Sequence, residues 1–165
     1  MSENSKPQDP ADRLPEQIAD LMAQGVTLGE MVGYDENDYA AIYALGHECY
    51  AQGRYSDAMK AFGFLVMHDH WESKYQIAFA ASLQMMGRYK EAIEHYSGAS
   101  AFDLSDPMPT FHTAECMIPL GMLDEAEEAL GIVLNQCEGH PQRTELKQNA
   151  EGLLSVVRQA RAQQG

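Results

Sequence analysis

The sequence predicts an all-α fold: three tandem helix–turn–helix repeats in a right-handed superhelix, with N-terminal helices before them and a C-terminal capping helix after them. Three glycines, Gly53, Gly87 and Gly121, are spaced 34 residues apart. Small and then large apolar residues follow them at fixed offsets: Ala58, Ala92 and Ala126, then Phe62, Tyr96 and Leu130. Small residues that recur in this way allow two helices to cross closely, so each period is one pair of helices joined by a glycine turn.

This period is typical of tetratricopeptide repeats, which stack into a curved solenoid whose concave face binds extended peptides. We expect the repeats to occupy residues 37–140, divided as 37–70, 71–104 and 105–140. The flanking parts are predicted to be a disordered tail at 1–10, an N-terminal helical region at 11–36 and the C-terminal capping helix at 141–165.

Each helix has its own local signal. A first helix is expected at about 12–24, where Leu14, Ile18, Leu21 and Met22 share one face. A short helix at 28–32 is capped by Thr27 and stopped by Gly33. The repeat helices are expected at 37–52, 56–68, 73–86, 89–102, from about 107, and 123–137, with Ser56 as the cap of the second of these. The last helix is expected at about 141–162.

Pro119 falls near the end of the first helix of the third repeat. A proline inside a helix costs about 3 kcal/mol, so this helix is expected to end or kink there. The sequence leaves open whether Pro119 is only a terminal-turn residue or also shapes the groove.

Charge and cysteine usage narrow the function classes. The formal net charge is −14, and residues 1–140 carry seven basic against twenty-three acidic groups. This field repels nucleic acid, which we exclude as a partner. Cys49, Cys116 and Cys137 show no CxxC spacing and suit a reducing compartment. We find no signal-peptide pattern and no apolar run of 18 residues, so we expect a cytoplasmic protein without membrane insertion.

No catalytic or cofactor motif is present, and we expect neither an enzyme nor a cofactor. His68 and His70, with His47, suggest a metal only superficially, because residues two apart on a helix point in different directions. His112 and Cys116 resemble a nucleophile pair, but nothing supplies an oxyanion site. We therefore expect no metal and no catalysis.

The groove-facing residues follow from repeat positions. From the first helix of each repeat these are Ala40, Tyr43, His47, Tyr50, Lys74, Ile77, Ala81, Met85, Phe111 and Glu115. Phe64 and His68, on the second helix of repeat one, are further candidates, although packing between helices is the more common role for residues at such positions. The list is mostly apolar and aromatic, which favours a docked peptide over a solvated face. The alternative, a flanking helix folded back into the groove, stays open.

Several strings resemble the class II chaperones of bacterial type III secretion systems, the LcrH/SycD type. They are IYALGHECYAQGRYSDAMKAF at Ile42–Phe62, HDHW at His68–Trp71, GRYKEAIEHYS at Gly87–Ser97, FHTAECM at Phe111–Met117 and QGVTLGEM at Gln24–Met31. The resemblance covers about residues 12–160.

This resemblance implies a bacterial cytosolic chaperone. Its clients would be hydrophobic translocator proteins, bound before export through an extended segment of the PxLxxP kind. The family's groove aromatics fall on Tyr43, Tyr50, Tyr55 and Tyr96, whereas His47 replaces a usual phenylalanine and His68 a usual leucine. Relatives often form homodimers through N-terminal helices, here with Leu14, Ile18 and Leu21 as the seam. Some relatives also have a transcription-factor partner.

Two other binding functions compete with this reading. One is a general tetratricopeptide scaffold in a cytosolic complex with no secretion role. The other is a cochaperone that clamps acidic C-termini, which needs several inward basic residues, and Lys74 is the one base found at the groove positions. The nature of the proteins that co-purify separates these hypotheses.

Overall fold

The computed structural model describes residues 20–164, and within them every regular element is helical. The elements are α2 (Leu28–Val32), α3 (Glu36–Ala51), α4 (Tyr55–His68), α5 (Ser73–Met85), α6 (Tyr89–Phe102), α7 (Met108–Met117), η2 (Ile118–Leu120), α8 (Leu123–Cys137), η3 (Pro141–Arg143) and α9 (Thr144–Gln164). The predicted disordered tail, and most of the predicted first helix, lie outside the described residues.

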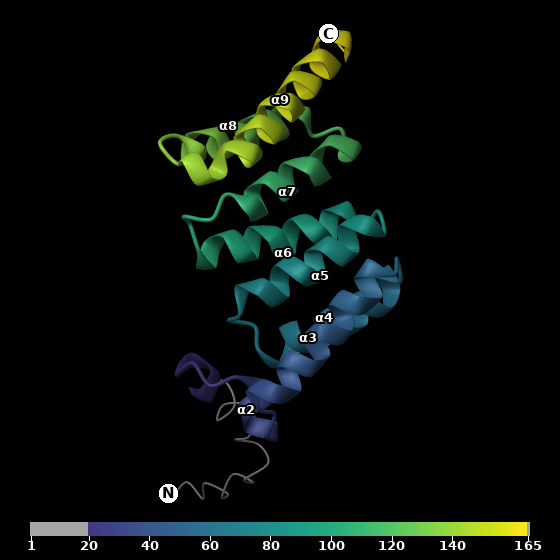
Figure 1. Ribbon diagram of the computed structural model, residues 1–165, viewed down its shortest axis with the longest axis vertical. Coiled ribbons are helices and arrows are strands. Elements are labelled where there is room, and N and C mark those ends of the chain that lie inside the picture. The colour runs from purple at the N-terminus through teal and green to yellow at the C-terminus, as the bar shows by residue number, and fades with distance from the viewer. Residues whose placement is uncertain (1–19, 165) are drawn as a thin grey trace, which may run out of the picture.

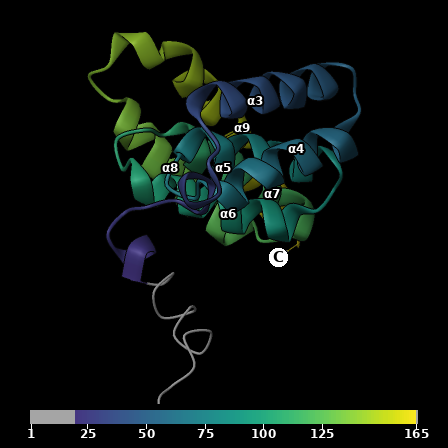
Figure 2. The same cartoon turned by 90° about the horizontal axis from the view of Figure 1, so that it is seen from below.

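From α3 to α9, each α-helix packs mainly against the helix before and after it in the chain. Figure 1 shows the resulting stack, which runs in chain order from α2 to α9. Seen along the stack in Figure 2, the helices overlie one another, and the purple segment that begins at residue 20 stands away from them. An array in which each repeat packs against the repeats next to it is the architecture of a repeat solenoid.

The alanines and large apolar residues that recur every 34 residues lie in the core of this stack. Ala58, Ala92 and Ala126 are fully buried, and the large residues that follow them, Phe62, Tyr96 and Leu130, are at most 1% exposed. Gly53, Gly87 and Gly121 each adopt a positive φ of about 75°, a conformation that glycine enters without strain. The turn glycines and the buried pairs therefore repeat together.

Most helix boundaries agree with the predictions within one residue, and α2 has the predicted bounds and the Thr27 cap. The predicted cap at Ser56 is wrong. Helix α4 begins at Tyr55, with Arg54 as its N-cap residue and no side-chain cap. The turn instead closes through backbone bonds, since the Gly53 amide donates to the Tyr50 carbonyl and the Arg54 amide to the Cys49 carbonyl. The chain enters α4 directly and leaves Ser56 inside it.

The helix break expected at Pro119 is confirmed. Helix α7 ends at Met117, and Pro119 lies in the short 3₁₀ turn η2 that follows, with its side chain exposed. Proline fits there because its missing amide hydrogen would not have had an α-helical acceptor. Pro119 thereby shortens the first helix of repeat three.

Helix α9 closes the C-terminal end of the stack. Its Ala150 and Val157 are completely buried in one core cluster with residues of α7 and α8. At the surface, Arg158 bonds to Glu127 at 2.8 Å, and Arg161 pairs with Asp124 and Glu127 of α8. The end of the array is thus covered by an amphipathic helix, as open repeat ends require.

Candidate functional site

The first helices of the three repeats, α3, α5 and α7, share one face, which we call the A-helix face. On α3 it carries Tyr43, His47 and Tyr50, spaced so that they align along one side of the helix. The rings of Tyr43 and His47 lie 4.4 Å apart, and the buried Phe62 ring lies 5.2 Å from His47. The Tyr50 ring contacts Tyr55, with a centroid separation of 5.2 Å. Exposed and half-buried aromatic rings therefore form a row on this face.

A polar network joins the second and third repeats on the same face. The Tyr96 hydroxyl donates to Gln84 Oε1 at 2.8 Å, and Gln84 Nε2 donates to Glu115 Oε2 at 3.2 Å. His112 Nδ1 lies 2.8 Å from the same Glu115 oxygen. The rings of Tyr96 and His112 are stacked, with centroids 5.3 Å apart. Four side chains from α5, α6 and α7 thus hold one another in place.

The charge state of this network follows from its surroundings. Burial acts to raise the pKa of Glu115, but hydrogen bonds from His112 and Gln84 outweigh it, and the net pKa is lowered. Burial raises the pKa of Tyr50, with smaller contributions from Tyr55 and the negative charge of Glu115. Glu115 is therefore an ionised acceptor at neutral pH, and its field reaches Tyr50 on α3.

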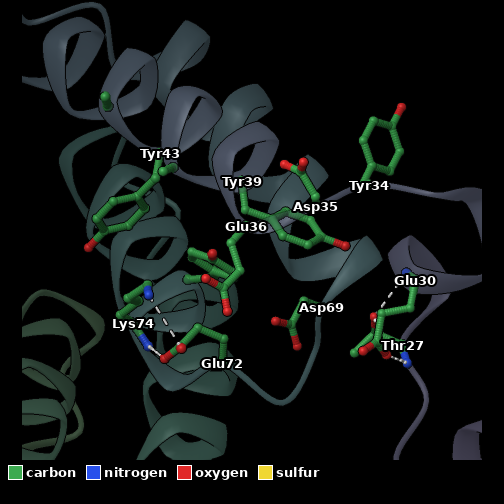
Figure 3. A pocket seen from close by; sticks show the side chains of 13 residues that line it. Thr27, Glu30, Tyr34, Asp35, Glu36, Tyr39, Tyr43, Asp69, Glu72 and Lys74 are labelled. Atoms are coloured by element: carbon green, nitrogen blue, oxygen red, sulfur yellow. Dashed lines mark hydrogen bonds and ion pairs between the residues drawn. The ribbon is translucent and has the colours of Figure 1, made fainter.

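The N-terminal end of this face opens into a cleft of about 880 Å³. We call it the tyrosine cleft, after the four side chains Tyr34, Tyr39, Tyr43 and Tyr75 that line it. Its walls come from α2, the start of α3, the α4–α5 connection and the start of α5, as the close-up in Figure 3 shows. Tyr43 belongs both to the cleft and to the row of aromatics on α3, so the two features are continuous.

Twelve of the fourteen predicted groove residues divide into three groups. Ala40, Tyr43 and Lys74 line the tyrosine cleft. Exposed or half-buried positions elsewhere on the first helices are His47, Tyr50, Ile77, Ala81, Met85 and Glu115, with Tyr55 at the start of α4. Tyr96 and Phe111 are core residues, 1% and 7% exposed. They support the face from below and offer little surface to a ligand.

Phe64 and His68 pack against each other. Their rings are stacked at 3.9 Å, and the Tyr34 ring meets both edge-on at 5.4 and 5.3 Å. His68 Nδ1 also lies 2.8 Å from the Phe64 carbonyl oxygen. This environment corresponds to the packing role that the sequence left open for these two residues.

Sequence reasoning missed Tyr34, Tyr39, Tyr75 and His112 as site residues. Tyr39 has a visible signal, because Tyr39, Tyr43 and His47 recur every four residues and so share a side of α3. Tyr75 carries no such signal: it becomes part of the cleft because the α4–α5 connection brings it to within 5.5 Å of Tyr43, measured between ring centroids. His112 joins the site through its contacts with Glu115 and Tyr96.

Neither a metal-binding cluster nor a membrane-spanning helix is found within residues 20–164. No three His, Cys, Asp or Glu side chains come together in an arrangement that could hold a metal. His70 packs on Trp71, with ring centroids 4.5 Å apart, while His68 is stacked on Phe64. Among the described helices, none combines the length and apolarity needed to cross a bilayer.

Comparison with known proteins gives consistent matches. The tetratricopeptide repeat family model matches residues 40–72 and 73–101. The low calcium response locus protein H of Yersinia pseudotuberculosis is 31% identical over 134 residues, covering 81% of this chain and 80% of the relative.

Solved structures agree with the sequence match. A type III secretion complex from Aeromonas hydrophila superposes with a TM-score of 0.84 at 29% identity, covering 89% of this chain and 98% of that one. The Yersinia enterocolitica type III secretion chaperone SycD, solved with a peptide of the translocator YopD, gives a TM-score of 0.72 at 31% identity, covering 77% and 97%.

Proposed function

This chain belongs to the LcrH/SycD family of type III secretion chaperones, and we propose that it binds an extended segment of a translocator protein along its A-helix face. Its role is that of a chaperone, and the family is not enzymatic. The observation that carries the proposal is the row of partly exposed aromatic rings, Tyr43, His47, Tyr50 and Tyr55, on a face that the chain itself leaves uncovered within residues 20–164.

The size of the face suits a short segment. Six extended residues span about 20 Å, which matches a three-repeat groove. Each apolar anchor that becomes buried contributes about 1.5–3 kcal/mol, while association costs at least about 4 kcal/mol. Two or three anchors therefore give at most about 5 kcal/mol net, which corresponds to a Kd of about 0.2 mM, and tighter holding of a client needs contacts beyond the face. We propose a PxLxxP-like segment as the anchor, as the family resemblance implies.

His47 and His68 depart from the residues usual in the family, and the two changes have different consequences. His47 is exposed on the A-helix face, against Tyr43 and Phe62, so it changes the surface that a client meets. His68 is stacked on Phe64 beneath Tyr34, so it changes how the connection between α2 and α3 is held. We propose that client selection is altered at His47 and not at His68.

A peptide titration tests the proposal. A fluorescent PxLxxP peptide should bind the wild type and lose about tenfold in affinity when Tyr50→Ala removes one buried aromatic contact. As a second variant, Tyr96→Phe is better than Tyr96→Ala. It breaks the hydrogen bond to Gln84 but keeps an aromatic ring at a position that is only 1% exposed.

Phe102→Ala is the matched control. Phe102 is an aromatic residue that is 46% exposed at the end of α6, where it contacts Trp71. Its removal should leave peptide affinity unchanged. Equal affinity in the wild type and Tyr50→Ala, or a loss in Phe102→Ala as large as in Tyr50→Ala, contradicts binding at the A-helix face.

Three further properties are proposed from the family resemblance. The protein acts in the bacterial cytoplasm, forms a homodimer through its N-terminal helix, and has a transcription-factor partner. Of the predicted dimer seam, Leu14 and Ile18 lie outside the described residues, and Leu21 is 40% exposed. Light scattering of Leu21→Asp checks the dimer: a mass unchanged from the wild type contradicts the seam.

Co-expression with neighbouring gene products, followed by mass spectrometry, identifies both clients and regulators.

A further inference from the structure

The tyrosine cleft is strongly acidic. Five carboxylates line it, Glu30, Asp35, Glu36, Asp69 and Glu72, against a single basic side chain among its lining residues, Lys74. Figure 3 shows the carboxylates around the central space, from α2, α3 and the α4–α5 connection. The A-helix face is largely apolar, but the cleft at its N-terminal end is acidic. This asymmetry favours a ligand that is apolar along the face and positively charged at the cleft.

Helix capping accounts for only part of this charge. Glu30 bonds to the backbone and hydroxyl of its cap partner Thr27, and Asp35 accepts two amides at the start of α3. Glu72 lies 3.4 Å from Lys74. Asp69 accepts a hydrogen bond from the Trp71 amide at 3.3 Å, but no salt bridge joins Glu36 or Asp69 to a described basic residue. Glu36 and Asp69 therefore add negative charge to the cleft that no described salt bridge balances.

The tyrosine rings offer faces to a cation. Successive centroids from Tyr34 to Tyr39, Tyr75 and Tyr43 are 6.2, 6.2 and 5.5 Å apart. Lys74 Nζ already lies 5.1 Å from the Tyr75 centroid and 5.8 Å from that of Tyr43. These distances are within the range of cation–π attraction. Lys74 thus occupies one end of the ring row, while Tyr34 and Tyr39 at the other end have no described cation over them.

The Tyr39 hydroxyl is an independent sign of an unfilled site. Tyr39 is only 8% exposed, and its oxygen is buried with no hydrogen-bond partner. The oxygen lies against Gly29, and the nearby Thr27 hydroxyl donates to Glu30 Oε2 at 3.1 Å. A buried hydroxyl without a partner costs stability. A hydrogen-bond donor that entered the cleft from a ligand would relieve this cost.

We propose that the tyrosine cleft binds a lysine or arginine side chain of the client, next to the segment that lies on the A-helix face. This inference rests on the proposed function and adds the chemistry of the client's flanking sequence. Tyr43 joins the two sites, so one extended chain passes from the aromatic row into the cleft. Glu36 and Asp69 supply the opposite charge, Tyr34 supplies a ring face, and Tyr39 supplies a hydroxyl acceptor.

Two labelled peptides of equal length test the inference. Both share one PxLxxP core; one is flanked on both sides by two arginines and the other by two glutamines. The arginine peptide should bind the full-length wild type about five- to tenfold more tightly, with an advantage that shrinks between about 0.05 and 0.5 M NaCl. In Glu36→Gln/Asp69→Asn the advantage should fall below about twofold, while affinity for the glutamine peptide stays unchanged.

The control separates the cleft from the general negative charge of the protein. Glu94→Gln/Glu128→Gln removes the same charge from exposed positions on α6 and α8 and should retain the arginine advantage. An equal advantage in both double variants, or none in the wild type, overturns the cleft site. Failure of the glutamine peptide to respond to Tyr50→Ala overturns the A-helix face instead, so the two proposals fail separately.

Discussion

Gly46→Ala is a sharp test of how closely α3 and α4 approach. Gly46 is buried in the middle of α3. A methyl group added there would lie 2.5, 2.7 and 2.9 Å from three carbons of the Phe62 ring. Real contacts of this kind need about 3.4 Å or more. The ring cannot retreat cheaply, because Phe62 is 1% exposed and packs against His47 and Tyr43.

The change in the free energy of unfolding that Gly46→Ala causes follows from two opposing effects. Alanine in place of glycine inside a helix gains about 1 kcal/mol. Overpacking of a well-filled core costs about 1–3 kcal/mol, and here the contact is with a rigid ring. We expect a net loss of about 1–2 kcal/mol in the free energy of unfolding, which lowers Tm by about 2–8 °C in a chain of this length. Client affinity should fall as well, because Phe62 supports Tyr43 and His47.

Urea and thermal unfolding of Gly46→Ala and Gly131→Ala measure these changes in stability directly. Gly131 lies inside α8, and an added methyl group there meets nothing within 4 Å, so its alanine variant should be stabilised by up to about 1 kcal/mol. Phe62→Leu in the Gly46→Ala background should recover part of the loss, a coupling that a double-mutant cycle detects. Equal stabilisation by both alanine variants would refute the close approach.

Three other predictions concern titration and the C-terminal cap. Because the pKa of Glu115 is lowered by hydrogen bonds that outweigh its burial, its contribution to stability should be lost as pH falls below the ordinary glutamate range, and Glu115→Gln should weaken that acid dependence in thermal melts. Burial raises the pKa of Tyr75 to about 12, so its stabilising contribution should be lost as pH rises from its ordinary value toward 12; alkaline absorbance titration should lose this late step in Tyr75→Phe. Arg161→Gln breaks exposed pairs with Asp124 and Glu127 and should cost less than about 1 kcal/mol; an equal loss at low and high salt would contradict an ionic origin.

The sequence by itself determined the helices and their order. The spacing of Gly53, Gly87 and Gly121 and the alanines after them predicts the turns and the crossings, because both depend on residues that are close in the chain. The bounds of α2, α6 and α8 agree with the predicted ones, and Pro119 ends α7 as its missing amide hydrogen requires. Ser56 was predicted wrongly, since the turn closes through its own backbone.

Only the tertiary structure decided which side chains meet. Local spacing places Tyr43, His47 and Tyr50 on one side of α3, but it does not say that Tyr96 and Phe111 are buried or that Tyr34 covers Phe64 and His68. The acidic tyrosine cleft is the clearest case, because α2, α3 and the α4–α5 connection build it together. Their approach depends on the crossing of the helices and the path of the connections, which residue periodicity does not specify.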